Sequence, residues 1–372
     1  MGQRRAPLGD MGIDPAFWAG KRVLLTGNTG FKGSWLTLWL LELGAEVQGL
    51  APGPPTDPSL YELAGIARDV PQALIDIRDY EAVVDTVRSA RPDIVIHMAA
   101  QPIVRESFIT PRETYEVNVM GTVNILDAVR VAGASVQAVI NVTSDKCYEN
   151  REWEWGYRED EPMGGYDPYS NSKGCSELVT SAFRQSFFGD AGAAHVASVR
   201  AGNVIGGGDW AADRLIPDVM RATLAGEAVP IRRPDAIRPW QHVLNPLSGY
   251  LEVAQQLCDS PSMATAFNFG PDDSDTRPVQ WLVEQIDARW PDPIDWQIDP
   301  GPHPHEATFL KLDSSRARSR LGWTPNWGLA EGLDSIVEWY LVLRDGASVR
   351  DLTLAQIQRF SSTYDNPHRS TT

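Results

Sequence analysis

The sequence predicts an α/β protein built on a doubly wound parallel sheet, with a smaller mixed α/β domain that binds the substrate towards the C-terminus. Up to Arg200, apolar runs of strand length alternate with segments of helical character. The runs are apolar almost throughout, which is typical of strands covered by helices on both faces. A glycine-rich turn joins the first run to the first helical segment. Together these observations predict a Rossmann-like fold.

The elements follow in regular order along the chain. The expected strands are residues 22–25, 46–50, 73–76, 93–98, 138–142 and 195–199. The helices expected between them are residues 34–43, 80–90, 111–132 and 169–188. Gly44, Arg91-Pro92 and Gly133 end the first three helices, because glycine and proline terminate helices. One further strand, at 267–270, is expected to return to the main sheet.

The composition of the sequence changes after Arg200, where glycine, proline and tryptophan become frequent. We therefore expect a cofactor-binding Rossmann-like domain over residues 17–200, with a segment near 240–270 returning to it. The substrate-binding domain is expected from residues 201–235 and 271–345, over the carboxyl edge of the sheet, where ligands bind in open α/β folds. The remaining residues, 1–16 and 346–372, are expected to form tails.

Composition excludes several classes of function. The chain of 372 residues has a net charge of −16, whereas nucleic-acid binders are usually basic, so no nucleic-acid partner is expected. No stretch approaches the ~20 apolar residues of a membrane span, and the N-terminus lacks the apolar core of a secretory signal. The three cysteines cannot all pair and match no zinc spacing. These features predict reduced thiols, no metal site, no membrane partner and a cytoplasmic location.

The turn at residues 26–33 reads TGNTGFKG, with glycines spaced G-x-x-G-x-x-G between the first strand and the first helix. Without Cβ atoms the backbone can approach a pyrophosphate, and the helix N-terminus supplies N–H groups and a positive dipole. The alternative is a plain strand–helix turn, which the surrounding pattern disfavours. The loop residues expected to contact a dinucleotide are Gly27, Thr29, Gly30, Phe31, Lys32 and Gly33.

Further cofactor contacts are expected where later strands end. Residues 49–53, after the second strand, contain neither the acid that would bind a ribose diol nor an arginine, so the residues leave NAD and NADP open. Asp76 is placed to meet the adenine end, although a turn cap is its alternative. The other contacts expected along the cofactor are Ile77, Ala99, Ala100, Gln101 and Asn118.

Tyr169 and Lys173, at positions i and i+4, share one face of a predicted helix. A phenol with a pKa near ~10 is a poor base at neutral pH. A neighbouring ammonium and a positive nicotinamide favour the phenolate, so we expect Tyr169 to remove a proton from a substrate hydroxyl that Ser144 holds. A surface Tyr–Lys pair is the alternative, which the glycine loop, Ser144 and Asn118 disfavour.

Asp145 and Lys146 directly follow Ser144. A simple dehydrogenase or epimerase needs neither of them, whereas an elimination needs one group to remove a proton and another to protonate the leaving hydroxide. Lys146 can act as a base only where its surroundings lower its pKa. A structural Asp–Lys pair at a strand end is the alternative. The expected catalytic residues are Ser144, Asp145, Lys146, Tyr169 and Lys173.

These motifs resemble those of the extended short-chain dehydrogenase/reductases that act on nucleotide sugars, in particular the CDP-glucose 4,6-dehydratases. The resemblance runs from about Phe17 to Tyr340. Its most specific segments are residues 26–36 (TGNTGFKGSWL), 143–148 (TSDKCY), 161–173 (EPMGGYDPYSNSK) and 200–210 (RAGNVIGGGDW). Other 4,6-dehydratases usually have Asp-Glu where this chain has Asp145-Lys146, and the lysine is the pattern of the CDP-sugar branch. Asn28 departs from the histidine expected in the loop.

The resemblance implies that the first domain binds NAD and the second a nucleotide sugar. The implied reaction is NAD-dependent dehydration of CDP-D-glucose to CDP-4-keto-6-deoxy-D-glucose, by C4 oxidation, elimination of water across C5–C6 and hydride return to C6. A dehydratase of a dTDP- or GDP-hexose, a nucleotide-sugar 4-epimerase and, more distantly, a non-catalytic dinucleotide sensor are the alternatives. A homodimer or homotetramer, paired through the helices expected at 111–132 and 169–188, is also implied. The implied substrate contacts are Asn203, Arg214, Arg238 and His305.

Overall fold

A parallel sheet of seven strands forms the centre of the computed structural model, which describes residues 12–132, 135–189, 192–301 and 309–364. The strand order is β11-β6-β5-β4-β1-β2-β3, and every neighbouring pair is parallel. The strands are β1 (Arg22–Thr26), β2 (Glu46–Leu50), β3 (Gln72–Ala73), β4 (Ile94–His97), β5 (Ala138–Val142), β6 (His195–Arg200) and β11 (Ala266–Asn268). The prediction of a doubly wound, Rossmann-like sheet is confirmed.

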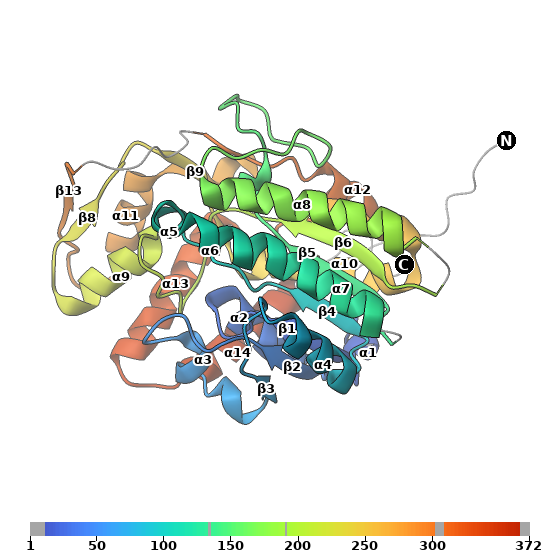
Figure 1. Cartoon of the computed structure of the whole chain (residues 1–372). Coiled ribbons are helices and arrows are strands. Elements are labelled where there is room, and N and C mark those ends of the chain that lie inside the picture. The colour runs from blue at the N-terminus through green and yellow to red at the C-terminus, as the bar shows by residue number, and fades with distance from the viewer. Residues whose placement is uncertain (1–11, 133–134, 190–191, 302–308, 365–372) are drawn as a thin grey trace, which may run out of the picture.

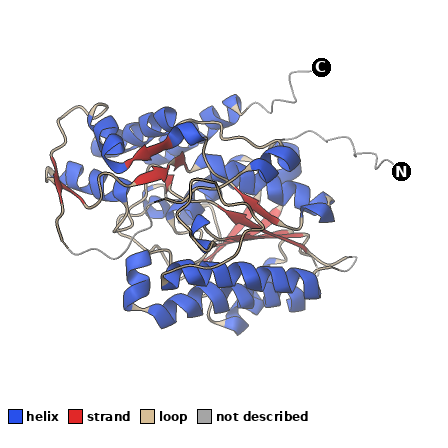
Figure 2. Cartoon of the chain, turned by 90° about the horizontal axis from the view of Figure 1, so that it is seen from above, coloured by secondary structure: helices blue, strands red, loops and turns tan. Residues whose placement is uncertain are grey.

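Helices cover both faces of this sheet, as Figure 2 shows from above. Because side chains alternate along a strand, Leu24 and Val95 point to one face, and Val23 and Ile96 to the other. The first face packs against α4 (Tyr80–Ala90), α7 (Gly121–Ala132) and α8 (Pro168–Phe187), and α7 and α8 run side by side in Figure 1. The second packs against α2 (Phe31–Glu42) and α10 (Leu244–Asp259).

Two elements differ from the sequence-based expectation. The helix expected over 111–132 is divided into α6 (Pro111–Tyr115), a π-helical turn (Glu116–Met120) and α7. The third strand ends at Ala73, not at residue 76, since Asp76 turns the chain by accepting a hydrogen bond from the backbone N–H of Arg78 at 2.8 Å.

The C-terminal part combines small sheets with helices at the carboxyl edge of the main sheet. Its strand pairs are β7 (Val204–Ile205) with β10 (Gln241–His242), β8 (Val229–Ile231) with β13 (Trp296–Ile298), and β9 (Ile237–Pro239) with β12 (Thr276–Pro278). Its helices are α9 (Leu215–Ala225), α11 (Val279–Asp287), α12 (Ser315–Leu321) and α13 (Leu329–Arg344). The division of the chain into two domains stays a prediction.

The segments expected as tails contain packed helices. Helix α14 (Val349–Thr363) lies against α2 and α13 and buries Ile357 and Phe360, while α1 (Pro15–Trp18) buries Trp18. The remaining short α-helices of the described residues are α3 (Leu60–Leu63) and α5 (Val104–Ile109). Within the described ranges, no helix has both the length and the apolar character that crossing a bilayer requires.

Candidate active site

The glycine loop between β1 and α2 contains two glycines that the fold itself requires. Gly27 has a φ of 71°, and a Cβ on it would lie 2.7 Å from the backbone nitrogen of Ala99. A Cβ on Gly33 would lie 2.1 Å from the carbonyl oxygen of Gly27. Gly30 differs, because a Cβ there would meet nothing closer than 3.4 Å. The protein leaves room at Gly30, where the first turn of α2 has no side-chain cap. Open space beside free N–H groups suits a pyrophosphate.

The polar side chains of this loop face different neighbours. The Thr29 hydroxyl donates to the carbonyl of Gly53 at 2.7 Å, which joins the loop to the turn after β2. Burial and the nearby Arg214 lower the pKa of Lys32 to about 8, while Asp145 and the carboxylate of Asp209 act in the opposite direction. Lys32, a residue of the expected cofactor loop, therefore lies near Asp145, the expected catalytic acid.

The residues after β3 are engaged within the protein. The Asp76 carboxylate accepts hydrogen bonds from the Arg78 guanidinium at 2.7 and 3.0 Å, and this pairing lowers the pKa of Asp76. Asp76 thus has the turn-capping contact that the sequence left as an alternative. Ile77 is buried against Gly121, where a Cβ would lie 2.3 Å from its Cδ1. Contact of Asp76 and Ile77 with an adenine stays a prediction.

The π-helical turn before α7 carries Asn118 to the loop after β4. The Asn118 side-chain oxygen accepts from the backbone N–H of Gln101 at 2.8 Å. Its amide nitrogen donates to the Gln101 carbonyl at 3.0 Å and to the Ser172 hydroxyl at 2.9 Å. Asn118 therefore fixes the Ala99–Gln101 loop to the turn of α8 that carries Lys173. Contact of Asn118, Ala99, Ala100 or Gln101 with a cofactor stays a prediction.

Ser144, Asp145 and Tyr169 come together at the carboxyl edge of the sheet, and each of them is buried. The Ser144 hydroxyl donates to the Asp145 carboxylate at 3.0 Å and accepts from the backbone N–H of Lys146 at 3.2 Å. A Cβ on Gly202 would lie 1.8 Å from Asp145 Oδ2, so this glycine makes room for the carboxylate.

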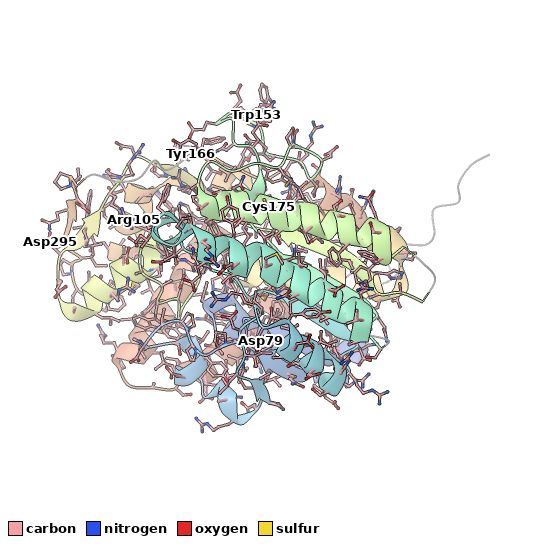
Figure 3. The ribbon with its side chains drawn as sticks, viewed as in Figure 1. Asp79, Arg105, Trp153, Tyr166, Cys175 and Asp295 are labelled. Atoms are coloured by element: carbon pink, nitrogen blue, oxygen red, sulfur yellow. The ribbon has the colours of Figure 1, made fainter. Side chains whose placement is uncertain are left out.

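The chain between the two expected catalytic segments leaves the sheet as a loop, on which Figure 3 labels Trp153 and Tyr166. It returns at Asp167, which caps α8 by accepting from the backbone N–H of Ser170 at 2.8 Å. Tyr169 is the second residue of that helix, so the cap fixes the position of the phenol.

Burial controls the pKa values of the pair Tyr169–Lys173. Burial, assisted by the Asp145 charge, raises the pKa of Tyr169 to about 12, although Ser144 and Arg214 counter part of the rise. Burial and the nearby Lys32 lower the pKa of Lys173 to about 8. In the chain alone burial dominates the pKa of both groups, and the expectation that the Lys173 ammonium and a positive nicotinamide together favour the phenolate stays a prediction. A positive nicotinamide would act on the phenol in the expected direction.

Lys146 is the least constrained of the expected catalytic residues. It lies in the short helical turn Asp145–Cys147 and is half-buried. Among the residues that the structure describes, its Nζ has no hydrogen-bond or ion-pair partner. Its role as a base stays a prediction.

The expected substrate contacts lie on loops and short strands. Arg214, at the start of α9, pairs with Asp209 at 3.0 Å and lies close enough to Tyr169 and Lys32 to act on the pKa of both. Asn203 has a φ of 49°, an uncommon backbone conformation for a residue other than glycine. Arg238 is half-buried on β9. His305 lies outside the described residues.

Sequence similarity identifies the family of the chain. The sequence model of the family described as GDP-mannose 4,6 dehydratase matches residues 24–336. The chain belongs to this family.

Relatives within the 4,6-dehydratase family cover most of the chain. CDP-glucose 4,6-dehydratase of Salmonella typhimurium is 56% identical over 333 residues, which are 88% of this chain and 92% of that protein. dTDP-glucose 4,6-dehydratase of Streptomyces antibioticus is 28% identical over 86% of this chain and 92% of its own. The crystal structure of DesIV, a dTDP-glucose 4,6-dehydratase from Streptomyces venezuelae with NAD and TYD bound, has a TM-score of 0.73 and 23% identity over 88% of this chain and 98% of its own. That likeness shows the shared fold.

Sequence reasoning missed residues that shape this 4,6-dehydratase-family site. Asp209 holds Arg214, and Gly202 makes room for Asp145; both lie in the glycine-rich segment 200–210. Tyr250, on α10, is fully buried, and its hydroxyl has no hydrogen-bond partner within the described part of the chain. The charges of Asp145 and Tyr169 add to burial in raising the pKa of Tyr250, so the three groups are neighbours. No local pattern marks Tyr250 in the sequence.

Proposed function

We propose that the chain is a NAD-dependent hydro-lyase that converts CDP-D-glucose to CDP-4-keto-6-deoxy-D-glucose. The observation that carries the reaction type is the buried Asp145 carboxyl group beside Ser144 and Tyr169. Oxidation of an alcohol requires a base and a hydrogen-bonding hydroxyl, whereas an additional acid at the same position suits the loss of water. The 56% identity to a CDP-glucose 4,6-dehydratase supports CDP as the nucleotide and glucose as the sugar.

The residues around the glycine loop suit a resident NAD+. Gly27 and Gly33 keep the loop tight, Gly30 leaves room, and the start of α2 presents free N–H groups to a pyrophosphate. The other proposed contacts are Thr29, Phe31, Lys32, Asp76, Ile77, Ala99, Ala100, Gln101, Asn118, Tyr169 and Lys173. When bound, NAD+ supplies the reversible oxidation that begins at C4 and ends at C6 of the sugar.

The side chains carry the proton transfers. Tyr169 removes the O4 proton while Ser144 hydrogen-bonds to O4, and a ketone forms at C4. This ketone acidifies the hydrogen on C5, which Lys146 removes. Asp145 protonates the C6 hydroxyl, which leaves as water. A proton then returns to C5 as C6 is reduced, so the reaction involves no net change in oxidation state.

Asn203, Arg214 and Arg238 are proposed to hold the sugar diphosphate, since guanidinium groups pair with phosphates in a bidentate manner. His305 is proposed as a further contact.

The cytoplasm is the proposed location, because Cys147, the most buried of the three cysteines, is a free thiol like the other two.

A homodimer or homotetramer is the proposed assembly. Large apolar side chains are exposed on the neighbouring helical turns and helices that would pair. They are Met120 before α7, Val131 on α7, and Leu178 and Phe187 on α8, which are 51%, 41%, 60% and 47% exposed. Analytical ultracentrifugation tests this assembly, and a monomer at micromolar concentration would contradict it.

The substrate is tested by incubating the purified chain and NAD+ with CDP-, dTDP-, UDP- and GDP-glucose in turn, and analysing the products by mass spectrometry. We expect loss of one water from the CDP-sugar at the highest rate. An epimerase would give a product of unchanged mass, and preference for another nucleotide would overturn the CDP assignment.

The catalytic residues are tested by separating oxidation from water loss. Tyr169→Phe should lower both by about 10²–10⁴-fold, because the phenol removes the first proton. Asp145→Asn and Lys146→Ala should still form reduced nicotinamide in a single turnover, but should release little dehydrated product. Tyr157→Phe, which deletes another buried tyrosine hydroxyl, is the control. Full dehydration by both Asp145→Asn and Lys146→Ala would refute these assignments.

A further inference from the structure

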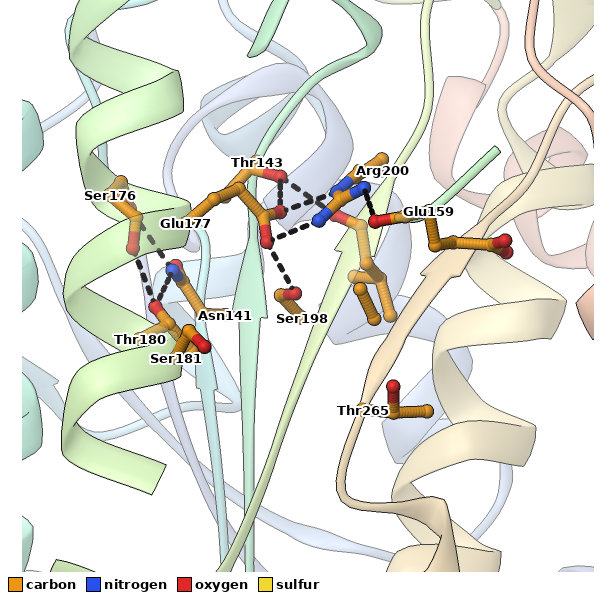
Figure 4. A network of polar contacts seen from close by, with 12 residues as sticks. Asn141, Thr143, Glu159, Ser176, Glu177, Thr180, Ser181, Ser198, Arg200 and Thr265 are labelled. Carbon is orange, nitrogen blue, oxygen red and sulfur yellow. Dashed lines mark hydrogen bonds and ion pairs between the residues drawn. The ribbon is translucent and has the colours of Figure 1, made fainter. Parts of the chain in front are cut away.

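A buried ion pair lies next to Thr143, the residue that precedes Ser144 (Figure 4). Glu177 on α8 and Arg200 at the end of β6 are each 3% exposed. The guanidinium donates to both carboxylate oxygens, from Nε to Oε1 at 2.9 Å and from a terminal nitrogen to Oε2 at 2.8 Å. The mechanism proposed above does not use either residue.

The two halves of this pair hold the two ends of one short segment. The Thr143 hydroxyl donates to the Glu177 carboxylate at 2.5 Å, and Arg200 donates to the Tyr148 phenol oxygen at 2.5 Å. Thr143 and Tyr148 flank residues 144–147, and the segment 144–146 within them contains the expected hydroxyl, acid and amine. The pair therefore connects both ends of that segment to α8, the helix that carries Tyr169.

We propose that the Glu177–Arg200 pair is a positioning device for the elimination, which holds segment 144–146 at a fixed place relative to Tyr169. This inference rests on the proposed function. Neither residue contacts the reacting atoms, and the pair acts only through the residues that it holds.

The hydrogen bonds around the pair make it suitable for this role. The Glu177 carboxylate also accepts from the Ser198 hydroxyl at 2.7 Å, and Arg200 also donates to the Glu159 carbonyl at 3.0 Å. The Tyr148 hydroxyl in turn donates to Asn268 Oδ1 at 2.8 Å. A buried charge pair gives geometric specificity more readily than net stability, and it does so when its hydrogen bonds are satisfied.

The same pair connects to the cofactor side of the site. Glu177 follows Lys173 by one helical turn, and its carboxylate opposes the burial that lowers the pKa of Lys173. The charge on Glu177 therefore supports the protonated form of Lys173, which the phenol of Tyr169 needs nearby.

Two hydroxyls that donate to the Glu177 carboxylate provide a matched test, because only that of Thr143 adjoins the segment 144–146. Thr143→Val and Ser198→Ala each delete one hydroxyl donor to this carboxylate, at buried positions. If the pair positions the segment, Thr143→Val should lower kcat for water loss by about tenfold or more, since small misplacements of reacting groups are costly. Ser198→Ala should keep kcat within about twofold, and KM should change little in both.

A second matched pair tests the other anchor. Tyr148→Phe removes the hydroxyl that Arg200 holds, whereas Tyr157→Phe removes the hydroxyl of the ring stacked on it at 5.1 Å, which faces Asn150. Only Tyr148→Phe should slow water loss. In Thr143→Val and Tyr148→Phe, the ratio of reduced nicotinamide to dehydrated product in a single turnover should rise. Loss of folded protein alone would not change this ratio.

Equal kcat values for Thr143→Val and Ser198→Ala, or an unchanged product ratio in Thr143→Val and Tyr148→Phe, would overturn the positioning role. These outcomes are read in a chain whose wild type dehydrates CDP-glucose. A wild type that releases no dehydrated product from any of the four nucleotide sugars would instead refute the proposed function, so the two failures are distinguishable.

Discussion

Two buried glutamates show how differently the fold treats the same side chain. Glu177 and Glu252, on α8 and α10, are 3% and 2% exposed. Burial alone would raise the pKa of Glu177, but Arg200 and the surrounding hydroxyls hold it below the usual value. Burial raises the pKa of Glu252 to about 8, and the hydrogen bond from the Tyr364 hydroxyl to Oε1, at 3.0 Å, counters only part of this rise. Its Oε2 has no hydrogen-bond partner among the described residues.

The comparison teaches that partners, and not burial, decide the charge of an interior carboxylate. Glu177 stays ionised at neutral pH and forms part of the scaffold behind the candidate active site. Glu252 is largely protonated at neutral pH, and it connects α10 to the residue that follows α14. We therefore expect the docking of the C-terminal helix to depend on pH in a range where the scaffold of the site does not.

The largest effect is expected from removing the charge of Glu177. Glu177→Gln leaves Arg200 buried without its counter-charge, which should lower the free energy of unfolding by roughly 3–5 kcal/mol at pH 7. Urea denaturation followed by circular dichroism measures this loss.

Glu113→Gln is the control for that experiment. Glu113 is 51% exposed and pairs with Arg78 at 3.3 Å on the surface, so its loss should cost less than about 1 kcal/mol. Similar losses for the two variants would show that the buried pair adds no more than a surface pair does.

The next effect concerns Glu252 and depends on pH. Its folded-state pKa is raised from 4.5 to about 8, so the folded chain keeps a proton that the unfolded chain releases between these values. Stability from this group is therefore complete below pH 4.5 and declines as the pH rises to 8, by up to about 1.4 kcal/mol per unit. Glu252→Gln removes the decline, and should exceed the wild type in stability at pH 8 by roughly 4 kcal/mol.

Denaturation of wild type and Glu252→Gln at pH 5 and pH 8 tests that sign. The difference between the two proteins should be small at pH 5 and large at pH 8, because contributions from other groups cancel in the comparison. A difference that is the same at both pH values would contradict the proposed burial of a neutral Glu252.

These two glutamates also show what the sequence could predict. The spacing of Tyr169 and Lys173 predicts a shared helix face, and Glu177 continues that face by one turn. Its partner Arg200 cannot be found in this way, because the pairing depends on the packing of α8 against β6 in the folded chain. The sequence likewise predicts the helix of residues 111–132 but not its π-helical turn, since no glycine or proline marks residues 116–120.

The residues expected to contact the substrate are harder to predict from sequence patterns than those expected to contact the cofactor. Asn203 and Arg214 entered only through the resemblance, because they lie where loops, and not repeating patterns, determine the backbone. Asn203 and the neighbouring Asp213 have φ values of 49° and 62°, a conformation that no residue-spacing rule predicts. The raised pKa of Tyr169 was also missed, since burial of a phenol is a property of the assembled site.

The smallest effect is expected from the hydroxyl of Tyr364, which donates to Glu252. Tyr364→Phe keeps the ring stacked on Phe360, at a centroid distance of 5.5 Å, and removes only the hydrogen bond. A hydrogen bond to a charged acceptor is stronger than one to a neutral acceptor. Tyr364→Phe should therefore lower the free energy of unfolding by about 1 kcal/mol at pH 5 and by roughly twice that above pH 8. In the double variant with Glu252→Gln, the increase with pH should disappear. If the loss in free energy of unfolding still increased with pH in the double variant, its source would lie outside the Tyr364–Glu252 pair. Glu252 would then be ionised at neutral pH, as Glu177 is.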